Sequence, residues 1–385
     1  MKHKYEVFIK NLDKKTNQSF DELIMGNTTT NILNKISNNN QIYITNKNNN
    51  IYKVSSPKNE IKQKIVINCE IKNIKDIINL IDKYPYHNNY DYNIDLKALH
   101  NIKNSLVQLN NMIGMEKLKS NIADQIIYFI QKLNIGSGGD FMHTVLSGPP
   151  GTGKTEIAKI IGNIFSKIGV LKKGIFKKVT RGDLIAGYLG QTAIKTKQVI
   201  DECIGGVLFI DEAYALGNSE KMDSFSKECI DTLCEALSDY KDNLMVIIAG
   251  YENELTNCFF KYNKGLESRF AWRFKIDNYD SKDLFNIFLK KIKDIDWEIH
   301  KDCNINEKWF EKNKDKFIYF GRDIETFISK IKISHSNRIF CLSEEYTKKI
   351  NMLDIENGFE KYLDNKNDNK EDAYFKNYLM NTLYS

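Results

Sequence analysis

The sequence predicts an α/β protein whose central domain is a doubly wound parallel sheet, and three observations lead to that prediction. Short apolar runs, typical of strands buried on both faces, alternate with amphipathic helical segments through the middle of the chain. The first of these strands leads into a glycine-rich loop that opens a helix. A later strand ends directly in two carboxylates, Asp211 and Glu212. Parallel sheets bind ligands at the carboxyl ends of their strands, so we expect both features at one edge.

Composition narrows the class of protein. The chain has 385 residues, enough for two or three domains, and its 42% hydrophobic content is ordinary for a globular protein. A net charge of +6 is too small to indicate a nucleic-acid partner by itself. No apolar run reaches the ~20 residues of a membrane span, and residues 1–5 lack the apolar core of a signal peptide. The 7 cysteines are scattered without a C-x-x-C pair, so we expect reduced thiols and a cytoplasmic protein that contacts no membrane.

Residues 1–95 are expected to form a separate N-terminal region, either a small α+β module or a loosely ordered arm. Short strands are predicted at 7–9, 42–44, 52–54 and 65–67, with asparagine-rich loops between them. Isoleucines at helical spacing predict a helix over 74–81 that ends before Pro85. No residue here carries recognisable chemistry, so the role of this region stays open.

The central domain is expected to span 96–280 and to begin with two helices, one from residue 96 to 106 and one from 118 to 129. Between them, Ile113 and Gly114 lie in an apolar segment ahead of the first strand. A glycine in that place can lay its backbone against a planar base. An ordinary turn between helices is the alternative.

The glycine-rich loop, residues 148–155, fits the pattern G-x-x-x-x-G-K-[ST]. It follows the apolar strand 144–146 and precedes a helix with isoleucines on one face, so a chance match is the weaker interpretation. Backbone N–H groups of such a loop surround phosphate oxygens, Lys154 reaches the β- and γ-phosphates, and Thr155 contacts Mg²⁺. The residues expected to bind the nucleotide here are Pro150, Gly151, Thr152, Gly153, Lys154, Thr155 and Glu156.

A second strand is predicted over 174–179, followed by a loop over 181–192. In this loop Tyr188 and Leu189 lie between Gly187 and Gly190. An exposed aromatic flanked by glycines is a candidate contact for a partner. The alternative is a tyrosine folded back on its own domain.

The third strand, residues 206–210, is apolar throughout and ends at the two carboxylates. We expect Asp211 to hold Mg²⁺ through water and Glu212 to polarise the attacking water of a phosphoryl transfer. A strand that merely ends in a solvated acidic turn is the alternative, and the pairing with the phosphate loop argues against it.

Two further strands, 244–249 and 269–276, complete the predicted sheet, with a helix around residues 230–237 before them. Residues 281–363 are expected to be helical, with apolar faces around 284–288, 309–310, 324–331 and 354–363. The charged run 364–372 is predicted to be a hydrated linker at the start of a C-terminal tail, residues 364–385.

Together these residues resemble the CfxQ/CbbX group of AAA+ ATPases, which includes Rubisco-activase-type and SpoVK-like sporulation proteins. The resemblance covers about residues 106–363. Residues 148–155 match the Walker A motif, 209–214 match Walker B, and 183–193 resemble the group's central-pore loop. The lysine- and asparagine-rich composition fits a giant-virus or protist member, whose place would be the host cytoplasm.

The resemblance implies a P-loop AAA+ module with a helical lid over 281–363, binding ATP and Mg²⁺ in a ring that is usually a hexamer. It implies that Ile113 and Gly114 contact adenine and that Arg269 acts as an arginine finger in the neighbouring subunit. Arg322 would begin the sensor-2 helix, and Tyr188 would line the pore. The segment 249–253 departs from the family pattern, which leaves the sensor-1 residue unassigned.

Three hypotheses follow. The first is an ATPase that remodels a protein client, of unknown identity, by pulling it through the ring. The second is an ATP-driven switch or loader acting on nucleic acid or an assembly, and the third is a nucleotide-stabilised scaffold. The intact pair Asp211 and Glu212 argues against the scaffold. The mild net charge and an aromatic pore loop argue against nucleic acid, so the first is preferred. Residues 1–95 match nothing familiar, so the Rubisco-activating role is not transferred.

Overall fold

The computed structural model describes residues 41–45, 51–55, 63–134, 140–188, 190–217, 223–341 and 346–366. The chain divides into two compact units, Met1–Gln63 and Lys64–Ser385. In the first, β1 (Gln41–Thr45) pairs antiparallel with β2 (Ile51–Ser55), which confirms the strands predicted at 42–44 and 52–54. The strand predicted at 7–9 lies outside the described residues.

The second unit contains a 5-stranded parallel sheet with the strand order β6-β7-β8-β5-β9. Strand β5 lies between β8 and β9, so that Leu146 pairs with Ala249 on one side and Phe274 on the other. The connection that leaves β5 runs to β6 at one edge of the sheet, whereas the connection that leaves β8 runs past β5 to β9 at the other edge. Connections from these two adjacent strands thus run in opposite directions, and α/β folds bind ligands at such a position. The strands are β5 (Thr144–Ser147), β6 (Phe176–Val179), β7 (Val207–Ile210), β8 (Met245–Gly250) and β9 (Trp272–Lys275).

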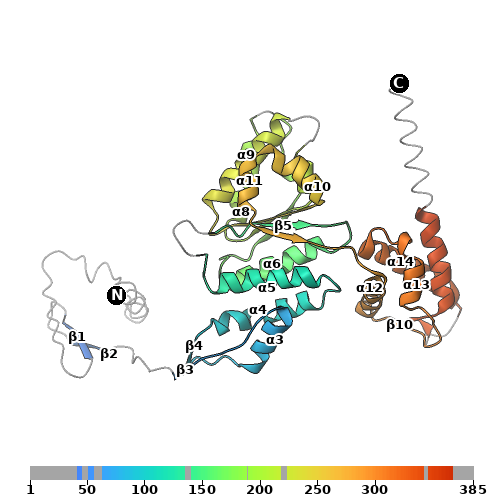
Figure 1. The fold of residues 1–385 in the computed structure, drawn as a ribbon, viewed down its shortest axis with the longest axis horizontal. Coiled ribbons are helices and arrows are strands. Elements are labelled where there is room, and N and C mark those ends of the chain that lie inside the picture. Colours follow the sequence, from blue (N-terminus) through green and yellow to red (C-terminus); the bar gives the residue numbers. More distant parts are fainter. Residues whose placement is uncertain are drawn as a thin grey trace. The chain divides into compact units, whose positions relative to one another are not determined.

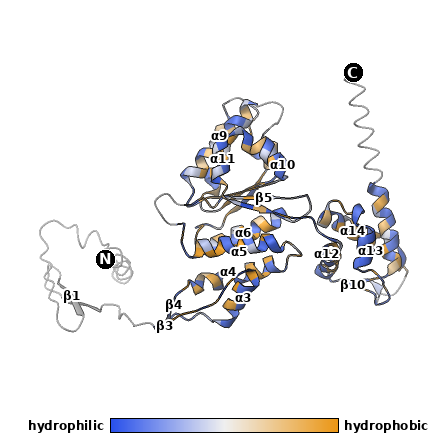
Figure 2. Cartoon of the chain, viewed as in Figure 1, coloured by the Kyte–Doolittle hydropathy of each residue, from blue (hydrophilic) through white to orange (hydrophobic). Residues whose placement is uncertain are grey.

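Alternate residues of these strands contribute to two hydrophobic cores, one on each face of the sheet. Leu146 and Phe209 belong to the core that includes α4 (Leu96–Asn110), α5 (Glu116–Ile130) and α6 (Lys154–Lys167). Their neighbours Val145 and Leu208 belong to the other core. That core includes α8 (Thr192–Cys203) and α9 (Ser224–Asp239), and Leu266 of α11 (Lys264–Arg269). Helices therefore cover both faces, which confirms the predicted doubly wound α/β fold. Figure 1 labels β5 in the sheet, with α5 and α6 on one side of it and α8 and α9 on the other. Figure 2 shows apolar and polar residues alternating along these helices, as expected of amphipathic helices.

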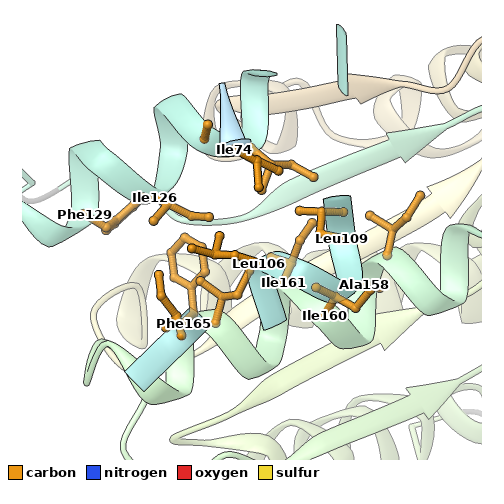
Figure 3. Packing of buried hydrophobic residues seen from close by; sticks show 14 of the residues in the cluster. Ile74, Leu106, Leu109, Ile126, Phe129, Ala158, Ile160, Ile161 and Phe165 are labelled. Atoms are coloured by element: carbon orange, nitrogen blue, oxygen red, sulfur yellow. The ribbon is translucent and has the colours of Figure 1, made fainter. Parts of the chain in front are cut away.

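The last third of the expected N-terminal region is not separate from the central domain: it packs through α4 and α5 into the core on one face of the sheet. Helix α3 (Ile74–Lys83) has an asparagine cap at Asn73 and buries Ile74, Ile77 and Ile81. These side chains belong to the same hydrophobic cluster as Leu106 of α4 and Ile161 of α6. Figure 3 labels Ile74, Leu106 and Ile161 in this cluster. The division between the two units falls between Gln63 and Lys64, so the boundary expected near residue 95 lies inside one core. Strand β3 (Gln63–Ile65) precedes α3 in the sequence and β4 (Tyr90–Tyr92) follows it, and the two form a separate two-stranded sheet.

The helical lid has its own hydrophobic core, rich in stacked aromatic rings such as Trp309 on Phe327. It contains α12 (Ser281–Asp294), α13 (Glu307–Lys312), α14 (Phe320–Ile339) and a helix over residues 352–366. The strands β10 (Glu298–Ile299) and β11 (Lys349–Ile350) pair in parallel beside them. The final helix extends to residue 366, so the predicted linker from 364 is wrong at its start, and 367–385 lie outside the described residues. None of the described helices combines the length and apolar character that a bilayer span requires.

His143, the residue before β5, links α9 to β8 through its side chain. Its Nε2 lies 2.9 Å from the carbonyl oxygen of Leu237, and its Nδ1 accepts a 3.1 Å hydrogen bond from the N–H of Val246. The ring must therefore be neutral, with its proton on Nε2. Burial, with repulsion from Arg269, lowers the pKa of His143 to about 4, although the bond to Leu237 acts in the opposite direction.

We expect this histidine to make the protein less stable in acid. The unfolded chain binds a proton near pH 6.5 and the folded one only near pH 4, so stability falls as the pH decreases through this window. A shift of this size corresponds to about 3 kcal/mol of unfolding free energy at most. The measurement is urea unfolding at several pH values for the parent and His143→Gln, whose amide can replace both hydrogen bonds without titrating. Parallel pH profiles for the two proteins would contradict the expectation.

Candidate active site

The glycine-rich loop joins β5 to α6, and two of its glycines have backbone conformations that other residues rarely adopt. Gly151 has a φ of +76° and Gly153 a φ of +88°. A Cβ on Gly151 would lie 1.9 Å from the carbonyl oxygen of Tyr319 in the lid. The loop is thus packed tightly against its surroundings. Its N–H groups lead into the N-terminus of α6, the arrangement that binds phosphate.

Lys154 is the first residue of α6, and its ammonium folds back over the loop. Its Nζ donates to the carbonyl oxygens of Gly148 at 2.8 Å and Pro149 at 2.7 Å. Burial and the nearby Arg322 lower the pKa of Lys154, while the carboxylates of Asp211 and Glu212 oppose that change. Asp211 and Glu212 after β7, and Arg322 of α14, therefore all lie close enough to the Lys154 ammonium to change its pKa. The structure brings these four predicted site residues together.

Asp211 and Glu212 follow β7 directly, as predicted. Asp211 accepts a 3.1 Å hydrogen bond from the N–H of Glu212 and lies 2.6 Å from the Nζ of Lys178. Glu212 adopts the left-handed conformation, with a φ of 51° and a ψ of 45°. Such a conformation costs a non-glycine residue on the order of 1 kcal/mol and is found preferentially at functional sites. This geometry argues against a plain acidic turn.

Lys178 was missed by the sequence reasoning. It lies in β6, paired in register with Phe209 of β7, and so it reaches the carboxylate at the end of the neighbouring strand. Parallel pairing of the strands 176–179 and 207–210 was the signal that could have found it. Two of the predicted site residues offer oxygen donors that would hold Mg²⁺: the hydroxyl of Thr155, in the first turn of α6, and the carboxylate of Asp211, directly after β7. Hard oxygen donors of this kind fit Mg²⁺ bound to a nucleotide's phosphates.

The lid and the segment just before it contact the backbone of the loop. The N–H of Gly321 donates to the carbonyl oxygen of Gly151 at 3.1 Å, and the Tyr279 hydroxyl donates to that of Thr152 at 3.2 Å. These contacts place the first turn of α14, which carries Arg322, directly beside the loop. Phe320, in the same turn, has a φ of 44°, a second strained residue at the site.

The segment predicted to contact adenine lies between the loop and the lid. The Cε of Met112 is 3.3 Å from the position of a Cβ on Gly153, and a carboxylate oxygen of Asp283 is 3.1 Å from the position of a Cβ on Gly114. Ile113 packs against the hydrophobic core of the lid. The segment is thus positioned to line one side of a nucleotide site.

Two grooves, of about 640 Å³ and 810 Å³, adjoin the loop and share Pro149 and Tyr251 in their walls. The ring of Tyr251 lies 5.9 Å from the Nζ of Lys154 and 5.9 Å from the ring of Tyr214. Glu252 and Asn253 line the first groove only. The segment whose sensor role was left open therefore lies at the site.

Arg269 lies elsewhere. It is the last residue of α11, which Asn263 caps, and β9 begins only at Trp272, so its expected place in a strand is wrong. Its Nε donates to the Oγ of Ser238 at 2.7 Å and its Nη1 to the carbonyl oxygen of Gly265 at 2.6 Å. Burial has the largest effect on the pKa of His143 and of Cys234, and the positive charge of Arg269 acts to lower both values. Burial also lowers the pKa of Lys154, but there it is the charge of Arg322 that acts in the same direction. Arg269 therefore does not belong to the group of residues around Lys154 in its own chain.

Tyr188 is 75% exposed, so the alternative in which it folds back on its own domain does not hold. A Cβ on Gly187 or Gly190 would meet no atom within 4 Å. The expected loop begins instead with a short helix, α7 (Arg181–Leu184), and becomes irregular after it. Leu189 lies outside the described residues.

Known proteins share this sequence pattern. Residues 144–278 match the family model described as ATPase family associated with various cellular activities (AAA). A cfxQ-like protein of Acanthamoeba polyphaga mimivirus is 43% identical over 283 residues, covering 73% of this chain and 70% of the relative. Protein CbbX of Cereibacter sphaeroides is 31% identical, covering 65% of this chain and 84% of its own. Stage V sporulation protein K of Bacillus subtilis is 34% identical, covering 63% and 77%.

Proposed function

The chain belongs to the CfxQ/CbbX family of AAA+ ATPases and hydrolyses ATP, and from this premise we propose that it remodels a protein client by threading it through a ring. The observation that carries the proposal is Tyr188, an exposed aromatic between two glycines with open space around them. An aromatic ring grips many sequences through apolar contact and loses little conformational entropy. Its aromatic rather than basic character favours a polypeptide over nucleic acid.

In this proposal each residue of the site has a role in phosphoryl transfer. Lys154 and the loop N–H groups bind the phosphates, Ile113 and Gly114 contact adenine, and Arg322 reaches the nucleotide from the lid. Thr155 and Asp211 would hold Mg²⁺, which would supply positive charge to the phosphates during the transfer. Glu212 orients the attacking water and accepts its proton. Support comes from the proximity of Asp211, Glu212 and Arg322 to the Lys154 ammonium.

The ring itself is part of the proposal. AAA+ proteins typically form rings, usually hexamers, and Arg269 lies away from the Lys154 cluster of its own chain, as a residue serving a neighbouring site would. We also assign the work to the cytoplasm, of the host if the protein is viral, which fits a relative from a giant virus.

Tyr188→Ala is expected to abolish stimulation of ATP turnover by a client while leaving folding, assembly and basal turnover nearly unchanged. An exposed side chain contributes little to stability, so the unfolding free energy should change by less than about 0.5 kcal/mol. The probe is a permanently unfolded polypeptide, reduced and carboxymethylated lactalbumin, added to an ATPase assay. The matched control is Tyr346→Ala, which removes an exposed tyrosine from the lid. Equal stimulation of the parent and the Tyr188 variant would refute a gripping role for this residue.

A further inference from the structure

Arg181 makes a group of contacts that the proposed roles do not use. Its Nη1 donates to the carbonyl oxygens of Ala215 at 2.8 Å and Leu216 at 3.1 Å, and to the Oγ of Ser226 at 2.9 Å. Its Nη2 lies 3.3 Å from a carboxylate oxygen of Asp223. One guanidinium thus joins a turn of the main chain to the first turn of α9. A planar group with several donors suits this arrangement, and a lysine ammonium would not replace it.

The turn that Arg181 contacts begins at the catalytic carboxylate. It is a 3₁₀ helix, η1 (Ala213–Leu216), for which Glu212 is the N-cap residue. The N–H of Ala215 donates to the carbonyl oxygen of Glu212 at 2.8 Å, so the contacted carbonyls are one turn from the strained backbone of Glu212. A displacement of Glu212 would therefore move the acceptors of Arg181.

The main chain that follows Arg181 leads to the exposed Tyr188. Arg181 is the first residue of α7, and the chain reaches Tyr188 soon after this helix ends. Helix α8 ties this stem down: the Nζ of Lys195 donates to the carbonyl oxygens of Gly182 at 2.7 Å and Ile185 at 2.9 Å. The hydroxyl of Thr196 donates to the carbonyl oxygen of Leu184 at 3.0 Å. The stem is therefore held as one piece.

The tip of the loop has fewer and longer ties: the N–H of Ala186 donates to the hydroxyl of Thr192, and the N–H of Gln191 donates to the carbonyl oxygen of Tyr188, both at 3.3 Å. The glycines on either side of Tyr188 have open space where a side chain would be, and Gly190 has a φ of +79°. When a firmly held stem carries a more weakly held tip, a small displacement of the base of the stem moves the tip. Arg181 lies at the base of this stem, where such a displacement would begin.

We infer that Arg181 is a positioning residue that couples the turn following Glu212 to the loop carrying Tyr188. Through it, the nucleotide state of the site sets the position of the exposed tyrosine. The inference deepens the proposed function and rests on it for its purpose, but the coupling itself is measurable without any client. A physical connection of this kind must be shown by a response that is lost when the connection is cut.

The experiment is hydrogen exchange of the full-length protein, comparing the ATP-bound and ADP-bound forms of Glu212→Gln. Peptides covering residues 185–195 report on the loop, and peptides covering 148–160 report on nucleotide binding. The test variant adds Arg181→Gln. The matched control adds Lys177→Gln instead, which removes a nearby cation from β6 that pairs only with the exposed Glu202 of α8 in the described structure.

We expect the loop peptides of Glu212→Gln and of the Lys177 control to exchange differently with ATP and with ADP. In the Arg181→Gln protein this difference should disappear, while nucleotide affinity and protection of 148–160 remain. A loop that still responds to the nucleotide without Arg181 would overturn the inference, as would a parent loop that never responds.

A second variant covers the case in which Arg181→Gln does not fold. Arg181→Lys keeps the positive charge and should recover stability, but its single ammonium cannot span the same acceptors, so the loop response should still be lost. A full response in this variant would also overturn the inference. Failure of the threading proposal would look different, because Tyr188→Ala would then leave client stimulation intact while the loop response of Glu212→Gln persisted.

Discussion

Replacing Glu212 with glutamine is expected to preserve ATP binding and to slow hydrolysis by about 10²- to 10⁴-fold, the usual contribution of a general base. The amide has nearly the shape of the carboxylate but cannot accept the proton of the attacking water. Lys154 and Asp211 are unchanged, so the groups proposed to bind the phosphates and the metal remain. The measurements are phosphate release under single-turnover conditions and the affinity for a fluorescent ATP analogue.

Lys154→Ala is the informative contrast for that experiment. It removes the ammonium that lies against the loop carbonyls and should abolish nucleotide binding itself. The two variants would thus fail at different steps, one before ATP binds and one after. Hydrolysis by Glu212→Gln at the parent rate would show that another group activates the water.

Arg269→Ala is expected to bind ATP normally and to hydrolyse it at least about 10³-fold more slowly, as when arginine fingers are removed elsewhere. The cation would stabilise charge developing on the γ-phosphoryl group of the neighbouring subunit. Mixing this variant with Lys154→Ala should restore part of the activity, because some interfaces then combine an intact site with an intact finger. Phosphate release measured across a series of mixing ratios tests this.

The contacts of Arg269 within its own chain require a control. Ser238→Ala removes the acceptor of the Nε hydrogen bond but leaves the cation in place, so it separates anchoring from charge. We expect it to reduce turnover far less than Arg269→Ala does. Absence of rescue at every mixing ratio would indicate a role within one subunit or a purely structural arginine.

The sequence predicted the sheet and the phosphate loop because their signals are local. An all-apolar strand such as β8 and the glycine pattern before Lys154 each leave few alternatives over a handful of residues. Asp211 and Glu212 were located for the same reason, at the end of the all-apolar β7.

Other features depend on contacts distant in sequence and were missed. Helix α8 was not predicted because it buries Thr192 and Thr196, which hydrogen-bond to neighbouring backbone groups instead of forming an apolar stripe. Arg269 was assigned to a strand because α11 has only Leu266 as a buried anchor. The contact of Lys178 with Asp211 exists only once two strands are paired in register.

The packing of α3 against α4, and of α4 against α6, links the nucleotide site to residues outside the matched ATPase segment. Helix α6 begins at Lys154, so its apolar face connects the phosphate loop to Ile74 and Ile77 through one continuous core. Segments that share a core open together in local unfolding, and a ligand that binds only the closed form suppresses that opening. Occupancy of the phosphate loop should therefore slow amide exchange in α3, on the far side of α4. A fragment that lacks α3 would then bind ATP more weakly than one that begins at residue 64.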